Sequence, residues 1–177
     1  MKFDLLRKSI LTILPHKKFQ DEEYRKSKAF LDNCNARTIV ASSSYEPAEG
    51  KFGILVTPDI LISDVKSMEF DAFILIGGVG SIEYWHNTGV HNLLKNANRD
   101  KKIIGAICLA PVTLANAGLL KGKKATAYNS ARSFLKWKGV KYTGNPVEIS
   151  GNIITAHDPE AIKEFIEAIA GQLAKYS

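Results

Sequence analysis

The fold is decided by the stretch Gly105-Ala106-Ile107-Cys108-Leu109-Ala110-Pro111. It joins an apolar run at residues 102–107, which predicts a buried strand, to residues 110–117, which predict a helix that ends before Gly118. An alanine stands two residues before the cysteine and another two residues after it. A nucleophile elbow requires small side chains at both places, so we expect Cys108 to project from a tight strand-to-helix turn.

Strand-like and helix-like segments alternate along the rest of the chain. Strands are predicted at residues 9–14, 37–41, 71–76, 125–128, 147–150 and 153–156, with a small hairpin at 51–56. Helices are predicted at residues 21–33, 89–97 and 130–138, and from about residue 159 onward. This alternation predicts an α/β domain with a mostly parallel sheet and helices on both of its faces. We expect residues 1–177 to form one domain.

Composition excludes several classes of protein. The chain has 177 residues and only two cysteines, Cys34 and Cys108, too few for a disulfide scaffold or a four-cysteine zinc site. We expect no metal and no cofactor, and we interpret Cys34 as a structural or surface residue. No apolar run reaches the length of a membrane span, and the N-terminus lacks a cleavage site, so we expect a cytoplasmic protein without a membrane partner.

The net charge of +6 carries less information. The lysines are spread along the chain, in pairs such as Lys17-Lys18, Lys101-Lys102 and Lys123-Lys124. None of these pairs is interleaved with aromatic residues. The sequence therefore favours a solvated lysine-rich surface over a nucleic-acid-binding protein.

A glycine cluster follows the predicted strand at residues 71–76. In Gly77-Gly78-Val79-Gly80 the missing side chains allow backbone N–H groups to approach a ligand, as in an oxyanion hole. The spacing fits neither a dinucleotide fingerprint nor a phosphate loop.

Four further residues are candidates for the wall of a pocket at the carboxyl edge of the sheet. His16 follows the first strand, and His157 follows the strand at 153–156. Tyr84 follows the glycine cluster, where it would face either the pocket or a neighbouring subunit. Tyr128 ends the strand predicted at 125–128.

With these residues assembled, the chain resembles the DJ-1/PfpI (ThiJ/PfpI) superfamily, including its PfpI-like intracellular protease and deglycase branch. The resemblance runs from Ser9 to Leu173 and is most specific over AICLAPVTLANAGLLKGKKAT (residues 106–126). Three other segments share it: FQDEEY (19–24), FDAFILIGGVGSIEYW (70–85) and IITAHDPEAIKEF (153–165). The resemblance implies a flavodoxin-like three-layer sandwich that assembles as a homodimer or a larger homo-oligomer.

The resemblance also assigns roles to individual residues. Cys108 matches the reactive cysteine of the family, and Glu23 matches the acidic residue that hydrogen-bonds to that thiol. Gly78 and the backbone at Leu109 match the amides that bind an oxyanion. A protonated carboxylic acid beside a thiolate stabilises it, so we expect a raised pKa for Glu23 and a lowered pKa for Cys108.

This sequence departs from the pattern of the family at three positions. Asp158 stands where members often have a glycine before the proline. Leu109 stands where the protease-like branch has a histidine directly after the nucleophile, and Tyr128 replaces the histidine that other members carry on the following strand. Because leucine cannot relay a proton, these replacements place peptidase activity in doubt.

Three functions remain open at this point. The first is an enzyme in which Cys108 attacks a small carbonyl electrophile such as methylglyoxal, or a peptide, with Glu23 shuttling protons. The second is a stress or redox sensor in which Cys108 is oxidised without efficient turnover. The third is a glutamine amidotransferase-like domain that uses Cys108 with His157 and Glu160. A Cys108 thiol that titrates above the ordinary value near 8.5 would instead favour an inherited site that has lost its activity.

Overall fold

The computed structural model describes residues 3–175. A seven-stranded sheet forms the centre of the protein. The strand order is β11-β12-β8-β7-β1-β3-β6, and each neighbouring pair is parallel except β11 with β12. The strands are β1 (Ser9–Ile13), β3 (Arg37–Ser42), β6 (Ile60–Leu61), β7 (Ala72–Leu75), β8 (Ile103–Ile107), β11 (Val147–Ser150) and β12 (Ile153–Ala156). The predicted mostly parallel sheet is confirmed.

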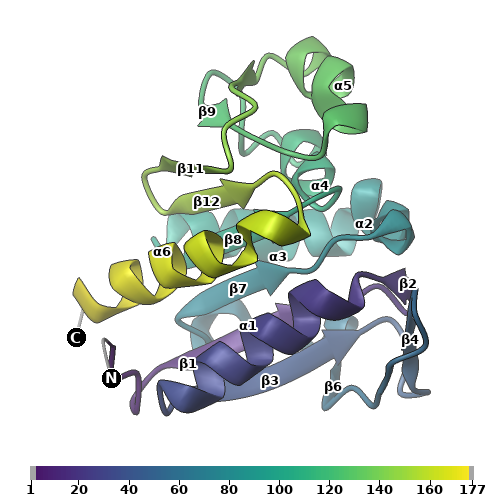
Figure 1. Cartoon of the computed structure of the whole chain (residues 1–177), viewed down its shortest axis with the longest axis vertical. Helices are drawn as coiled ribbons and strands as arrows, with labels where there is room; N and C mark the ends of the chain where they lie inside the picture. Colours follow the sequence, from purple (N-terminus) through teal and green to yellow (C-terminus); the bar gives the residue numbers. More distant parts are fainter. Residues whose placement is uncertain (1–2, 176–177) are drawn as a thin grey trace.

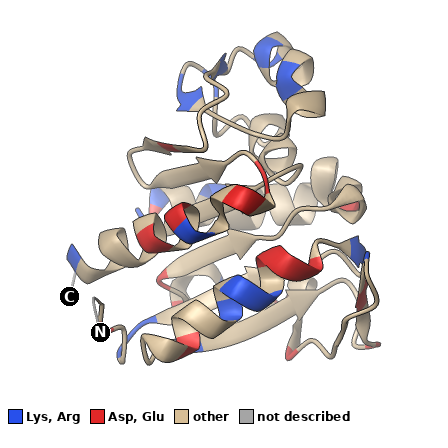
Figure 2. Cartoon of the chain, viewed as in Figure 1, with Lys and Arg blue, Asp and Glu red and all other residues tan. Residues whose placement is uncertain are grey.

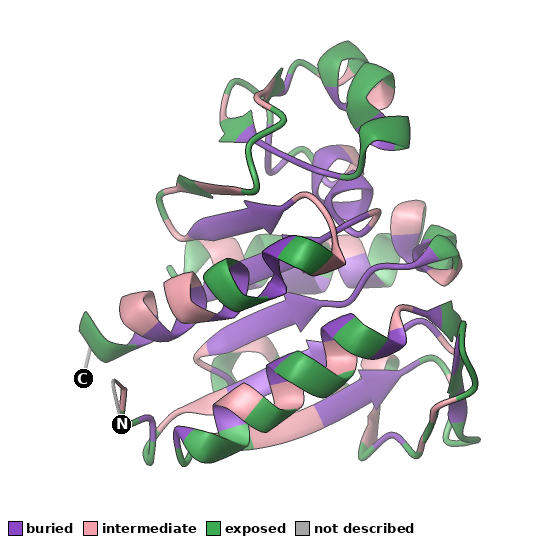
Figure 3. Cartoon of the chain, in the orientation of Figure 1, coloured by how far each residue is buried: buried purple, intermediate pink, exposed green. Residues whose placement is uncertain are grey.

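Helices cover both faces of this sheet, as predicted. One layer holds α1 (Asp21–Asn33) and α6 (Ile162–Lys175), and the other holds α3 (Thr88–Arg99) and α4 (Pro111–Asn116) (Figure 1). The central strands are buried between the two layers (Figure 3). The contact between α6 and β8 is so close that a Cβ on Gly105 would lie 2.6 Å from Ile169 Cδ1, which accounts for a glycine inside a core strand.

Smaller elements extend the carboxyl edge of the sheet. A three-stranded sheet contains β2 (Lys17–Phe19), β4 (Ala48–Gly50) and β5 (Leu55–Val56). A short helix α2 (Ile82–Trp85) follows the glycine cluster. At one end of the molecule, β9 (Lys124–Ala125) pairs with β10 (Lys141–Tyr142), and α5 (Arg132–Trp137) lies between them in the chain (Figure 1). Short 3₁₀ turns occupy residues 62–64, 67–69, 79–81, 129–131 and 159–161.

Two predicted segments differ from the structure. The hairpin expected at residues 51–56 pairs Ala48 with Val56 instead, because the Asp21 carboxylate accepts the N–H groups of Phe52 (2.9 Å) and Ile54 (3.0 Å) and holds that stretch as a turn. The strand expected at 125–128 ends at Ala125. Beyond it, the Thr126 N–H donates to the Thr155 hydroxyl rather than to a neighbouring strand backbone.

The sequence analysis did not predict β2, β6 or α2, each of which has four residues or fewer. Elements this short show no hydrophobic period that a pattern search can detect. Within residues 3–175, no helix has the length and apolar character needed to cross a membrane.

Candidate active site

Cys108 lies at the junction of β8 and α4, in a backbone conformation that is rare for a non-glycine residue. Its φ angle is +61°, in the left-handed region, and its side chain is 8% exposed. The Cys108 N–H donates to the Ala156 carbonyl at 3.0 Å, and the Cys108 carbonyl accepts from the Tyr128 N–H at 2.8 Å. These bonds to two neighbouring segments hold the strained turn of a nucleophile elbow in place.

A second anchor fixes the residue after the cysteine. The Trp85 indole N–H donates to the Leu109 carbonyl at 3.2 Å, so α2 is tied directly to the elbow. The Leu109 N–H remains directed at the Cys108 sulfur, to which it donates a hydrogen bond.

The glycine cluster packs directly against the cysteine. A Cβ added to Gly77 would lie 2.6 Å from the Cys108 Cβ and 2.5 Å from the Ile107 carbonyl oxygen, so only glycine fits there. Gly78 has a φ of +98°, and its N–H donates a hydrogen bond to the Cys108 sulfur. Gly78 and Leu109 therefore present two backbone donors at the sulfur, as an oxyanion site requires.

Glu23 approaches the same point from the first turn of α1 and is completely buried. Its Oε2 accepts the Gly77 N–H at 2.8 Å, and the carboxyl group also hydrogen-bonds to Cys108. Burial raises the pKa of Glu23 to about 8, opposed by the Gly77 hydrogen bond and reinforced by the charge of Asp158. The predicted rise in the pKa of Glu23 is confirmed.

The predicted decrease in the pKa of Cys108 is wrong. Burial, followed by the negative charge of Glu23, raises the pKa of this thiol to about 12. The N–H groups of Gly78 and Leu109 act in the opposite direction but are outweighed. The prediction failed because the position of the helix N-terminus can be inferred from the sequence, whereas the depth of burial cannot.

His157, Asp158 and Tyr128 form the side of the site nearest to β12. His157 Nδ1 lies 2.6 Å from Asp158 Oδ2, and the His157 ring lies 6.0 Å, centroid to centroid, from the ring of Tyr128. Asp158 Oδ1 accepts from the N–H groups of Glu160 (2.9 Å) and Ala161 (3.3 Å) and so caps the turn that leads into α6. The imidazole is thus paired with a carboxylate rather than with the thiol.

The sequence analysis did not recognise Asp158 as a member of this site. Its negative charge raises the pKa of both Glu23 and Cys108. The Asp-Pro-Glu sequence at the start of α6 was the available signal, since aspartate before proline is typical of a helix N-cap.

Two of the predicted pocket residues lie elsewhere. Tyr84 is 2% exposed, and its hydroxyl donates to the Leu14 carbonyl at 2.8 Å, so it belongs to the core and not to a pocket wall. His16 lies at the predicted edge, but its backbone N–H is bound by Glu83 (2.8 Å), and it lines a separate cavity of about 460 Å³ with Val79 and Ile82. Cys34 is buried at the end of α1, which agrees with a structural role.

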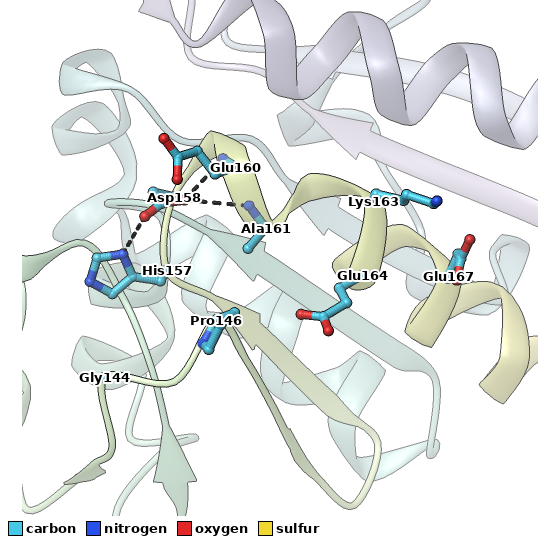
Figure 4. Close-up of a pocket in the computed structure, with 9 residues that line it drawn as sticks. All are labelled: Gly144, Pro146, His157, Asp158, Glu160, Ala161, Lys163, Glu164 and Glu167. Carbon is cyan, nitrogen blue, oxygen red and sulfur yellow. Dashed lines mark hydrogen bonds and ion pairs between the residues drawn. The ribbon is translucent and has the colours of Figure 1, made fainter.

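A larger cavity, of about 690 Å³, opens beside the site (Figure 4). His157 and Asp158 form one end of it, next to the cysteine elbow, and the first turns of α6 form a wall. Carboxylates dominate the lining, with Lys163 as the one basic side chain: Asp158, Glu160, Glu164 and Glu167. The cavity adjoins the site through His157 and Asp158, and its lining favours neutral or cationic groups over anions. No three His, Cys, Asp or Glu side chains within residues 3–175 gather in a way that could hold a metal ion.

Comparison with known proteins agrees with this geometry. The DJ-1/PfpI family model matches residues 8–172. The uncharacterized protein MJ0967 of Methanocaldococcus jannaschii is 36% identical over 159 residues, covering 88% of this chain and 78% of that protein. The glutathione-independent glyoxalase DJR-1.2 of Caenorhabditis elegans is 30% identical, covering 90% of this chain and 85% of that protein.

Solved structures lead to the same result. The crystal structure of a ThiJ/PfpI domain protein from Brachyspira murdochii superimposes with a TM-score of 0.93 at 32% identity, covering 98% of this chain and 99% of that one. The chain therefore belongs to the DJ-1/PfpI family.

Proposed function

We propose that the protein is a cysteine-dependent enzyme that converts small reactive carbonyl compounds, with methylglyoxal as the representative substrate. The observation that carries this proposal is the buried Glu23 carboxyl group, with a pKa of about 8, in contact with a thiol that two backbone N–H groups face. One group can exchange protons near neutral pH and the other can form a covalent bond. The glyoxalase named among the relatives supports the same chemistry here.

The first step joins the sulfur to the substrate. The Cys108 sulfur attacks the aldehyde carbon while its proton passes to the ionised Glu23 carboxylate. The aldehyde oxygen gains the electron pair of the broken π bond and is held by the N–H groups of Gly78 and Leu109. Glu23 then returns the proton to this oxygen, which gives a neutral hemithioacetal.

The following steps move a proton between two carbons. Glu23 removes the proton from the former aldehyde carbon and delivers it to the neighbouring ketone oxygen, while the electron pair of the broken C–H bond forms the C=C bond of an enediol. Glu23 then removes the proton of the hydroxyl group on the first carbon and delivers it to the neighbouring carbon, which restores a carbonyl at the first carbon and gives a lactoyl thioester on Cys108. One carbon is oxidised as the other is reduced, so no external oxidant is needed. Hydrolysis of the thioester by water releases lactate and restores the thiol.

Peptide hydrolysis is less well supported by this site. A leaving amine requires an acid, but Leu109 replaces the neighbouring histidine and His157 is paired with Asp158. The same pairing weighs against an amidotransferase, because Glu160 lies exposed and Asp158, not Glu160, orients the imidazole.

Turnover of methylglyoxal tests the proposal. We expect loss of methylglyoxal and formation of lactate by the wild-type protein, and a decrease of at least about 100-fold for Cys108→Ala, since the covalent step is lost. Cys34→Ala is the matched control, because it removes the other thiol without touching the site, and should retain full activity. A rate that Cys108→Ala leaves unchanged would contradict the proposal.

Redox sensing is the second candidate function. Oxidation by peroxide requires a thiolate, and the raised pKa and low exposure of Cys108 weigh against a sensitive sensor. Mass spectrometry after mild peroxide treatment tests it. Sulfinic acid confined to Cys108, in a protein that does not convert methylglyoxal, would move the assignment to a sensor. The raised pKa of Cys108 meets the condition for an inherited site that has lost its activity, so this is the third outcome of the tests. Absence of both methylglyoxal turnover and peroxide oxidation would establish it.

We further propose that the chain forms a homodimer or a larger homo-oligomer. Val79 (53% exposed) and Ile82 (61% exposed) present apolar side chains next to the glycine cluster. A second subunit would cover these two side chains and the cavity that they line with His16. Sedimentation velocity on the wild type and on Ile82→Glu tests this, with a shift toward monomer expected for the variant.

A further inference from the structure

The positive charge of the protein is concentrated in one part of the fold. Residues 119–146, which contain β9, α5 and β10, are here called the basic lobe. The lobe carries seven Lys and Arg residues and no Asp or Glu: Lys121, Lys123, Lys124, Arg132, Lys136, Lys138 and Lys141. The other 17 Lys and Arg are matched by 18 Asp and Glu, so the lobe supplies all of the net charge of +6. In Figure 2 the basic lobe lies at the top, where Lys and Arg are the only charged residues.

The charges of the basic lobe are not neutralised within the chain. Among residues 3–175, no ion pair involves any of its seven basic side chains. Lys124 and Lys141 are direct partners in the pairing of β9 with β10, an arrangement of like charges that destabilises a sheet. The folded protein therefore maintains a repulsive cluster that a polyanion would relieve.

Aromatic rings stand among these charges. Trp137 is 76% exposed, and the Lys138 ammonium lies 4.8 Å from its ring centroid. The Arg132 guanidinium lies 6.0 Å from the ring centroid of Tyr142. Lys136 and Lys138 flank Trp137 directly in the sequence, at the end of α5. The sequence analysis considered other lysine pairs and did not single out this aromatic-interleaved pair.

We propose that the basic lobe binds single-stranded nucleic acid, with phosphates on its lysines and a base stacked on Trp137. A basic surface that tracks the backbone, combined with an exposed aromatic ring, is the arrangement by which proteins bind single strands. An anionic membrane is less well matched, because Leu135 is buried and Trp137 is the one exposed large apolar side chain of the six-residue α5. The site is independent of Cys108 and of the proposed carbonyl chemistry.

The backbone of the lobe is well suited to hold such a surface in place. The Gly122 N–H donates to the Gly139 carbonyl (2.8 Å), and the Tyr142 hydroxyl donates to the Ala127 carbonyl (3.0 Å). Phe134 stacks on Trp85 at a centroid distance of 6.5 Å, which ties α5 to the body of the protein.

Fluorescence anisotropy with a labelled 20-nucleotide RNA of mixed sequence tests this proposal on the intact protein. We expect binding that weakens as KCl rises from 50 to 200 mM, because each neutralised phosphate contributes about −0.7 to the slope of log affinity against log salt. Lys136→Gln/Lys138→Gln should reduce that slope by about one unit. Lys66→Gln/Lys95→Gln removes the same charge from exposed positions outside the lobe and should change the slope little.

Base stacking is tested separately. Trp137→Ala should weaken RNA binding at least about fivefold, whereas Trp137→Phe retains a ring and should retain most of the affinity. Neither substitution should affect binding of inorganic polyphosphate, which has no bases, and Cys108→Ala should bind RNA like the wild type. The proposal is overturned by no RNA binding at 50 mM KCl, by equal losses in the two double variants, or by binding to phosphatidylglycerol vesicles without binding to RNA.

Discussion

Glu23 and Cys108 share one buried site in which the carboxyl group, not the thiol, loses its proton first as the pH rises. Burial raises the pKa of Glu23 to about 8 and that of Cys108 to about 12. The negative charge of Glu23 is itself a cause of the raised Cys108 pKa. A free thiolate therefore does not accumulate near neutral pH, and sulfur chemistry at this site requires that a proton leave as the new bond forms.

The pH dependence of turnover follows from this order of ionisation. If ionised Glu23 accepts the Cys108 proton, kcat/KM for methylglyoxal should rise about tenfold per pH unit below 8 and level off above it. Initial rates from pH 5.5 to 9.5, corrected for loss of methylglyoxal in buffer alone, provide the measurement. Glu23→Gln should lack the bend near pH 8, since amides do not titrate in this range. A rate that decreases through pH 8 would instead identify the protonated acid as the active form.

Stability should depend on pH through the same carboxyl group. The pKa of Glu23 is about 8 in the folded protein, whereas the ordinary value of 4.5 applies in the unfolded chain. The folded state therefore favours the protonated form of Glu23. The resulting stabilisation is complete below pH 4.5 and is lost as the pH rises to 8, a change on the order of 5 kcal/mol.

Urea unfolding at pH 5, 7 and 9 tests this dependence. Glu23→Gln should remove most of the decrease between pH 5 and 9, because its side chain remains neutral. Glu22→Gln is the matched control, since the neighbouring Glu22 is exposed and pairs with Lys26 at the surface, and it should retain the wild-type dependence. Parallel pH curves for the wild type and Glu23→Gln would show that Glu23 is ionised in the folded protein well below pH 8.

Gly77 should tolerate no side chain. A methyl group there would lie 2.6 Å from the Cys108 Cβ and 2.5 Å from the Ile107 carbonyl oxygen, so the elbow must shift. We expect Gly77→Ala to cost about 1–3 kcal/mol of stability and at least about tenfold in turnover. Gly171→Ala is the control, because Gly171 lies in α6, where a Cβ would come no closer than 3.7 Å to a neighbour and alanine is the better helix former, so stability should hold or increase. Normal activity in Gly77→Ala would show that the elbow geometry is not required.

The sequence was sufficient for the features that depend on local pattern. The mostly parallel sheet and its two helix layers follow from alternating apolar strands and helices, and the elbow follows from the small residues around Cys108. The order of the strands does not follow from local pattern. The position of Glu23 came from resemblance, because a glutamate in the first turn of a helix is usually solvated. The burial that gives it an unusual pKa depends on packing of α1 against the loop at Gly77, which no local pattern reports.

Two predictions failed for different reasons. Tyr84 was expected to face the pocket or a neighbouring subunit, but its hydroxyl donates to the Leu14 carbonyl, a partner 70 residues away that no local pattern reports. The lysines were interpreted as scattered, although seven Lys and Arg without any Asp or Glu occupy the single stretch 119–146. That cluster could have been found by comparing the net charge of successive windows of the sequence.

Asp158 offers a way to change the ionisation of the site without altering its shape. Its charge raises the pKa of Glu23 and of Cys108, and its Oδ1 caps the start of α6. Asparagine caps helices as well as aspartate does but carries no charge, so Asp158→Asn should move the bend in the kcat/KM profile to lower pH with little loss of stability. Asp158→Ala removes the cap as well and should cost about 1 kcal/mol in urea unfolding. If Asp158→Asn leaves the bend in place, the charge of Asp158 is neutralised in the working enzyme, and His157, 2.6 Å away, is the group placed to do so.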